Sequence, residues 1–242
     1  EELLSINSKD STKVPYLVQY EESGYSVLRR LAAENGEWFF FDGKQLQYGK
    51  PEKQKETELT IGEDVWEFQL KQSIQYMGFS LSSYNRHQDE PFVAAAKDQE
   101  SGLEEKGPLR EAAGKRSAKL TNKRPSLHAT GPVGKGEELE KQVLVRKRQM
   151  AANLQVITGH SASPAFRPGH LIIVKHRFQE GGKTLGKYVI TKVVHHYNWG
   201  GKIYTNTFEA VDAGAKAIPD DSLQRNRQRA FTDRAKVHDT ND

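Results

Sequence analysis

The sequence predicts a mainly β, α+β protein in which a helix-plus-sheet domain is followed by a small antiparallel β-barrel domain. Three observations support this fold class. A helical apolar period at residues 23–35 runs directly into a strand of four aromatic residues. Residues 59–82 alternate between apolar and polar positions, as half-buried strands do. Residues 154–211 form β-branched runs separated by glycine-containing turns, the pattern of a small barrel or sandwich.

The helix predicted at residues 23–35 organises the first half of the chain. Ser23 is a suitable N-cap, because its hydroxyl can accept a hydrogen bond from an otherwise unpaired first-turn amide. Asn35-Gly36 supplies the left-handed residue that commonly ends a helix. The apolar residues that share one face at helical spacing are Val27, Leu28, Leu31 and Ala32.

An unusually aromatic strand follows this helix. Trp38–Phe41 are four large rings in a row, and Asp42-Gly43 directly after them is a strong hairpin signal. Leu46 and Tyr48 alternate on the return strand. Four consecutive rings are too apolar for a solvated strand. We therefore expect the aromatic strand to be covered on both sides, one of them by the preceding helix.

Two further strand predictions concern the segments around this unit. Val14–Tyr20 alternates weakly and is expected to form a strand that leads into the helix. Trp66, Phe68 and Leu70 recur with a period of two and are expected to share one face of a longer strand.

The middle of the chain predicts two helices. Residues 94–136 are the poorest segment for a core and are expected to be an extended or partly ordered arm, with a short basic helix at residues 109–120. Residues 137–153 give the better helix, because its first turn is acidic and its later part basic, which suits the helix dipole.

These elements divide the chain into four predicted parts. Residues 1–97 are the helix-plus-sheet part, and residues 98–136 are a basic connecting arm. Residues 137–213 are a helix followed by the antiparallel barrel-like domain. Residues 214–242 begin as a polar linker.

Composition limits the classes of function. The 242 residues include no cysteine, which excludes disulfides, thiolate catalysis, thiolate–zinc sites and iron–sulfur clusters. No run of about 18 apolar residues exists to span a membrane. The chain opens with Glu1-Glu2 where a signal peptide would need a basic and then an apolar region, so no membrane anchor and no signal peptide are expected.

Motifs that could carry chemistry are weak. His195 and His196 are adjacent, so in a strand they point to opposite faces and cannot chelate one metal together. The run Gly159-His160-Ser161 resembles a nucleophile elbow only superficially, because the final glycine and the strand–elbow–helix context are missing. No glycine-rich phosphate loop precedes a helix. We therefore expect no catalytic residue, no metal site and no cofactor.

The formal charge of +4 is distributed unevenly along the chain. Residues 106–148 hold 12 Lys or Arg and 4 Asp or Glu, a net of +8, which leaves −4 for the remainder. Such a cluster could bind phosphates or an acidic partner. It contains no aromatic residue for base stacking, which argues against single-strand readout. The candidate residues for a polyanion or partner surface are Lys115, Arg116, Lys119, Lys123, Arg124, Arg146, Lys147 and Arg148.

The order of these motifs resembles the hub region of VgrG spike proteins of type VI secretion, which are similar to the baseplate hub of contractile phage tails. The resemblance runs from about residue 14 to residue 213, and the basic arm 94–136 departs from it. The first set of matching residues is Tyr20, Glu22, Ser23, Leu28, Arg30, Leu31, Glu34, Gly36, Phe39–Phe41, Asp42 and Gly43. The later matches are Gly159–His170, Tyr188–His195, Tyr204–Ala210 and, as the start of an OB-fold, Arg234–Val237.

The resemblance implies a phage-tail-hub-like fold and a structural, non-enzymatic function. Three copies would form a hollow ring that joins a sixfold tube to a threefold needle and helps to deliver effectors. The implied partners are further copies of the chain, the tube protein, and spike-tip or effector proteins. The implied site of assembly is the bacterial cytoplasm, with delivery to the extracellular space or a target cell. The alternative function is a module that binds nucleic acid or another polyanion through residues 106–148.

Overall fold

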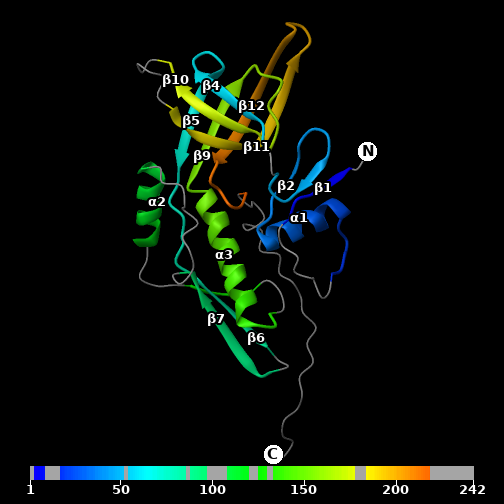
Figure 1. Ribbon diagram of the computed structural model, residues 1–242, viewed down its shortest axis with the longest axis vertical. Coiled ribbons are helices and arrows are strands. Elements are labelled where there is room, and N and C mark those ends of the chain that lie inside the picture. Colours follow the sequence, from blue (N-terminus) through cyan, green and yellow to red (C-terminus); the bar gives the residue numbers. More distant parts are fainter. Residues whose placement is uncertain are drawn as a thin grey trace, which may run out of the picture.

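The computed structural model describes residues 3–8, 17–51, 54–85, 88–96, 108–119, 125–129, 133–177 and 184–218. A β-barrel lies at one end of the molecule, a three-stranded sheet lies at the other end, and helix α3 (Gly136–Ala152) runs between them (Figure 1). Helix α1 (Gly24–Asn35) and a second small sheet lie to one side of α3. This mainly β architecture confirms the predicted fold class.

The barrel is a closed sheet of six strands in the order β10-β11-β12-β9-β5-β4. Strand β4 closes it by pairing in parallel with β10, and the other ladders are antiparallel except for a short parallel contact between β4 and β5. The strands are β4 (Glu56–Ile61), β5 (Val65–Gln72), β9 (Gln155–Ser161), β10 (Leu171–His176), β11 (Thr184–Asn198) and β12 (Ile203–Asp212). Strands β4 and β5 lie within residues 1–97, so both halves of the chain contribute to the barrel.

The barrel interior is a packed apolar core. Phe166 and Phe208 meet edge to face at its centre, with ring centroids 5.3 Å apart. Gly159 is required beside them, because a Cβ atom there would lie 2.9 Å from the Phe208 ring. The buried residues of this core are Leu59, Val65, Ile157, Phe166, Ile172, Val174, Tyr188, Ile190, Phe208 and Ala210.

One strand prediction is wrong within this barrel. The ladder between β5 and β9 shifts register between Trp66 and Gln69, and Glu67 has a positive φ of 54°. The bulge places Trp66 opposite His160 and 39% exposed, whereas Phe68 packs against the barrel core. Trp66 therefore does not share a face with Phe68, because the extra residue reverses the alternation.

The side unit contains α1 and a three-stranded sheet in the order β1-β3-β2. The strands are β1 (Leu4–Ile6), β2 (Phe39–Phe41) and β3 (Leu46–Tyr48). The Oγ atom of Ser23 accepts a hydrogen bond from the Ser26 amide at 3.2 Å, and Gly36 ends the helix with a φ of 71°. Both ends of the predicted helix are thus confirmed, as is the β2–β3 hairpin.

The aromatic strand is covered on both faces over most of its length. Phe39 contacts Tyr25 of α1, with ring centroids 5.1 Å apart. Trp38 and Phe40 are buried on the opposite face, where they pack against Val189 of β11. Phe41, at the end of the strand, is 53% exposed, so the expectation of full coverage is wrong there.

The strand predicted at residues 14–20 is not observed in its described part. Residues 14–16 lie outside the described residues, and residues 17–20 have no regular secondary structure. Side chains bind the backbone here in place of a neighbouring strand. Arg30 Nη2 donates to the Val18 carbonyl at 3.2 Å, and Gln19 Nε2 donates to the Glu22 carbonyl at 2.7 Å.

The far end of the molecule is a sheet in the order β7-β6-β8 packed against α3. Its strands are β6 (Ser80–Asn85), β7 (Glu90–Ala95) and β8 (Ser126–His128), and helix α2 (Pro108–Lys119) lies beside β5. The predicted helices 109–120 and 137–153 are confirmed. The stretch expected to be an arm contributes α2 and β8, and β8 extends the sheet.

Substituting Gly36 with alanine tests the packing of α1 on α3. A Cβ atom at Gly36 would lie 2.9 Å from a methyl of Val145, and the left-handed backbone disfavours any side chain. We expect Gly36→Ala to lower the free energy of unfolding by about 1–3 kcal/mol in urea titrations. Gly24→Ala, in the first turn of the same helix, is the control, because no heavy atom lies within 4 Å of its Cβ position. Equal stability of the two variants would contradict this account.

Candidate assembly surfaces

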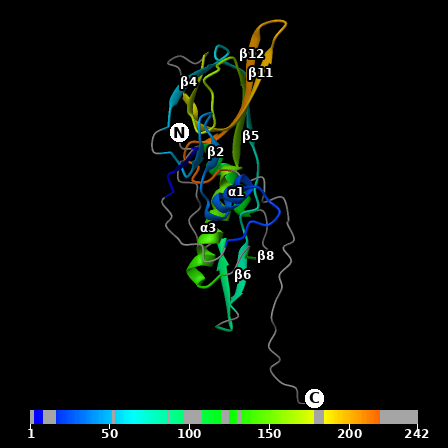
Figure 2. The same ribbon diagram turned by 90° about the vertical axis from the view of Figure 1, so that its right-hand side faces the viewer.

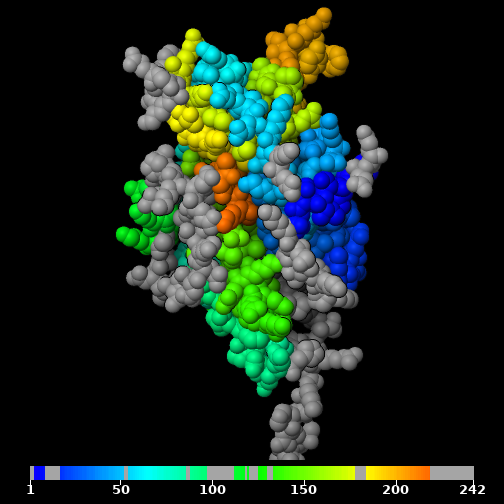
Figure 3. Space-filling view, viewed as in Figure 1, coloured from blue at the N-terminus to red at the C-terminus, as the bar shows by residue number. Residues whose placement is uncertain are grey.

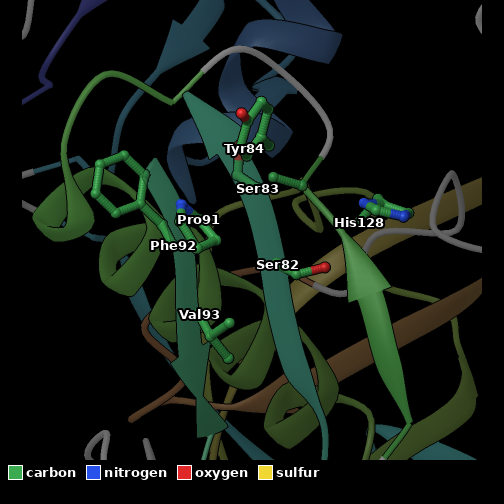
Figure 4. Close-up of a pocket in the computed structure, with 8 residues that line it drawn as sticks. Ser82, Ser83, Tyr84, Pro91, Phe92, Val93 and His128 are labelled. Carbon is green, nitrogen blue, oxygen red and sulfur yellow. The ribbon is translucent and has the colours of Figure 1, made fainter. Parts of the chain in front are cut away.

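A shallow hollow lies on the face of the β7-β6-β8 sheet that is turned away from α3 (Figure 4). Its volume is about 370 Å³, and it is lined mainly by small, aromatic and apolar side chains from the three strands. Ser82 and His128 are opposite each other in the β6–β8 ladder, a pair that could suggest nucleophilic chemistry. The Ser82 hydroxyl instead donates to the Leu127 carbonyl at 3.4 Å, so the geometry does not show an activated serine.

The other residues weighed for chemistry lie in barrel strands. Ser161 is fully buried in β9, where its Oγ atom accepts a hydrogen bond from the Ser163 amide at 3.0 Å. His160 faces Glu67 at 3.5 Å on the outside of the barrel. Within the described ranges, no three His, Asp or Glu residues are placed to hold a metal ion. No helix of the described chain is long and apolar enough to cross a membrane.

The basic residues that the sequence singles out lie on two helices where the structure describes them, and they differ in exposure. Lys115, Arg116 and Lys119 are exposed on α2. Lys123 and Arg124 lie outside the described residues. Arg146, Lys147 and Arg148 lie on α3, where Lys147 is buried and the other two are half-buried. The polyanion surface stays a prediction, and the structure describes three of its eight residues as exposed.

Arg146 and Lys147 contribute to the packing of α3 against the β7-β6-β8 sheet, which we call the distal sheet. Lys147 Nζ donates to the carbonyl of Ala96, just beyond β7, at 2.7 Å. The Arg146 guanidinium lies over the Phe79 ring, 5.6 Å from its centroid, and burial lowers the pKa of Arg146. The Lys147 ammonium is therefore hydrogen-bonded inside the molecule, and the Arg146 guanidinium contacts an aromatic ring, although its Nε atom has no hydrogen-bond partner among the described residues.

A junction joins the β2–β3 hairpin to the barrel. Partial burial of Asp42 favours its neutral form, but hydrogen bonds from the Gln45 and Lys44 amides and from the Gln47 side chain outweigh this effect. The pKa of Asp42 is therefore lowered. The guanidinium of Arg167 packs over Gly43 at the hairpin turn, and Gly169 leaves room for the Phe40 ring. Close contacts at Gly43 and Gly169 thus hold the hairpin against the barrel.

His170 lies in this junction and gives a pH-dependent prediction. Burial first, and then the charges of Lys55 and Arg167, lower the pKa of His170. The folded state therefore binds this proton less well than the unfolded state, whose histidine pKa is about 6.5. The contribution to stability is complete above that pH and is lost as the pH falls. We expect His170→Asn to flatten the decrease in unfolding free energy between about pH 7 and pH 5, measured by urea titration. An unchanged slope would contradict the assignment.

The most prominent surface feature is a two-stranded ribbon formed by the ends of β11 and β12. Residues 203–205 of β12, which come before Asn206, have no ladder with β9, and β10 pairs with β11 only at residues 184–189. The ribbon, residues 196–205, therefore projects from the barrel (Figures 1 and 2). Its tip exposes Tyr197, Trp199 and Ile203. The rings of Tyr197 and Trp199 are in contact, with their centroids 4.8 Å apart.

A second apolar surface lies on the side unit. We call it the N-terminal apolar face, and it consists of exposed residues before and within α1 and at the end of β2. Tyr25 contacts the half-buried ring of Phe39, and Phe41 lies two residues further along β2, on the same side of the strand by its alternation. The members are Leu17, Val18, Tyr20, Tyr25 and Phe41.

The sequence analysis did not identify either surface. The sequence predicts a turn at Asn198-Trp199-Gly200-Gly201. The tryptophan in this turn was the available signal for a contact surface, because turns seldom expose so large an apolar side chain. Tyr20 and Tyr25 could not be assigned to a surface without the packing of α1.

This mainly β fold with its six-stranded barrel is that of phage tail proteins. A tail protein from Neisseria meningitidis MC58 is similar with a TM-score of 0.58 and 10% identity, over 88% of this chain and 61% of that one. The 43 kDa tail protein of prophage MuSo2 from Shewanella oneidensis is similar with a TM-score of 0.54 and 15% identity, over 89% and 61%. The E. coli c3393 protein, a type VI secretion component, is similar with a TM-score of 0.44 and 15% identity, over 88% of this chain and 44% of that one.

The chain belongs to the phage tail baseplate hub (GPD) family, whose profile matches residues 4–201. No curated protein matches it in sequence. The chain spans about 61% of the length of the two tail proteins described above. The family is structural and not enzymatic, which confirms the expectation that the protein is not an enzyme. The chain is thus a member of a family of structural phage tail baseplate hub proteins.

Proposed function

We propose that this hub component is VgrG-like and forms a trimeric ring that joins tube to needle in a contractile injection machine. The hub family supplies the structural role, and the VgrG-like order of motifs from residue 14 to residue 213 favours the type VI version of it. The observation that carries the proposal is the pair of exposed apolar surfaces on a protein whose barrel core is already complete. Exposed aromatic clusters of this kind are typical of protein–protein contacts.

The proposed partners are other copies of the chain, the tube protein, and spike-tip or effector proteins. The ring would assemble in the bacterial cytoplasm and be carried outward with the contracting machine. None of these functions requires a catalytic group, a metal or a cofactor in this chain.

The test is the mass of the purified protein in solution, measured by light scattering over a range of concentrations. We expect three times the chain mass of 27.3 kDa. A monomer at every concentration would overturn the ring. A stable dimer would also overturn it, because the proposed ring has threefold symmetry.

A further inference from the structure

We propose that the ribbon tip of one copy binds the N-terminal apolar face of a second copy. This inference rests on the proposed function, because it names the two surfaces through which copies of the hub would meet. It commits to a second copy of this chain as the occupant of the tip.

The ribbon tip has the properties of an inserted contact element. Trp199 is 83% exposed, although tryptophan is among the residues that contribute most to protein interfaces. A two-stranded ribbon without further strands is only marginally stable in water. The Tyr197 ring holds Trp199 edge to face, so the tip presents a preformed aromatic pair. A partner surface would cover these rings and stabilise the ribbon.

The N-terminal apolar face offers a matching surface on a firmly held base. Tyr20 is 76% exposed, and the segment that carries it is tied to α1. Arg30 binds Glu22 at 2.6 Å and also the Val18 carbonyl. The backbone that carries these apolar side chains is therefore already fixed and needs little additional ordering when a partner arrives, which favours binding.

The two surfaces also complement each other in charge. The ribbon, residues 196–205, contains Lys202, one histidine and no carboxylate. Residues 17–25, which carry four of the five members of the N-terminal apolar face, contain Glu21 and Glu22 and no Lys or Arg, and Glu22 pairs with Arg30 of α1. Two copies of either surface would bring like charges together, whereas the tip against the N-terminal face brings opposite charges together. Complementarity of this kind selects the partner and the orientation.

The contact has to form between copies. Trp199 and Tyr20 are both mostly exposed within one copy, so neither surface covers the other. In the space-filling view the tip stands out from the end of the barrel and is not seated on the side unit (Figure 3). A contact between two different patches is head to tail, and repetition of such a contact closes a ring when the rotation allows it.

The absence of cysteine makes a direct test possible. Gly200→Cys places one thiol at the tip, where its Cβ atom has room, and Gln19→Cys places one thiol on the N-terminal apolar face. Mixing the two variants under mild oxidation is expected to give a disulfide-linked dimer of unlike chains. Val93→Cys, 71% exposed on the distal sheet, is the matched control and should link to neither. Linkage of Gly200→Cys to Val93→Cys as readily as to Gln19→Cys would overturn the assignment.

Light scattering on two charge-adding variants separates this inference from the proposed ring. Trp199→Asp and Tyr20→Lys each alter one highly exposed residue, and each variant alone is expected to be monomeric. An equimolar mixture should recover a dimer, because one intact tip and one intact face remain. If both variants assemble like the natural chain, the surfaces are wrong while the ring stands. If the natural chain itself stays monomeric, both proposals fail.

Discussion

Trp38→Ala is expected to lower the free energy of unfolding by about 3–5 kcal/mol, the range for removing a fully buried tryptophan. Trp38 is 1% exposed and joins the aromatic strand to Val189 of the barrel. The Lys50 ammonium lies 5.2 Å from the centroid of its ring. The cavity left by alanine would lie between the side unit and the barrel, so neither part could easily close it. Chemical denaturation followed by circular dichroism measures the change.

Trp199→Ala is the matched control, since it makes the same substitution in the same chain at an exposed site. At dilutions where light scattering shows a monomer, it should change the unfolding free energy by no more than about 0.5 kcal/mol. Trp38→Phe is a second comparison, because the indole N–H of Trp38 has no hydrogen-bond partner among the described residues. Phenylalanine removes that buried polar group and should cost much less than alanine. A loss in Trp38→Ala no larger than that in Trp199→Ala would contradict the role given to the junction.

The side unit could be predicted because its signals are local. Ser23, Gly36 and the Asp42-Gly43 turn each act within a few residues of the element that they begin or end. The rings of Trp38–Phe41 required a cover, and α1 ends only a few residues before this strand, close enough to provide one. The location of the second cover, on β11 about 150 residues later, has no local signal.

The barrel could be predicted as a class but not as a set of strands. Strand β4 pairs in parallel with β10, and β5 pairs with β9, so partners lie 83 to 115 residues apart in the chain. Period-two alternation describes a strand and says nothing about its neighbours. The bulge at Glu67 shows a second limit, because one extra residue changed which side chains face the core.

The basic cluster shows why charge alone did not identify a surface. A run such as Arg146-Lys147-Arg148 is most simply interpreted as solvated, since charged residues are seldom buried. Helix α3 lies against the distal sheet and also contacts α1. Because α3 has neighbours on more than one side, these three residues are buried or half-buried. In two of the three side chains, a contact within the protein takes the place of water around the charged group. Lys147 contacts a backbone carbonyl, and Arg146 contacts an aromatic ring.

Lys147→Ala should therefore behave as a core substitution. The buried carbonyl of Ala96 would lose the donor that Lys147 supplies at 2.7 Å, and the packing of the methylene stem would be lost with it. We expect a decrease in unfolding free energy of about 2–4 kcal/mol in urea titrations. Lys147→Met keeps most of the stem and removes a buried charge. It should cost clearly less, because relief from burying the ammonium offsets part of the lost hydrogen bond.

Lys141→Ala is the control for this comparison, since it removes an exposed cation from the same helix. It should change stability by no more than about 0.5 kcal/mol. The same variants also bear on the polyanion hypothesis. If Lys147 is engaged inside the fold, Lys147→Met should leave any salt-sensitive affinity for nucleic acid unchanged, whereas removing exposed Lys115, Arg116 and Lys119 together should weaken it. A loss of such affinity in Lys147→Met without a loss of stability would show that the ammonium reaches solvent, and the packing role would then be wrong.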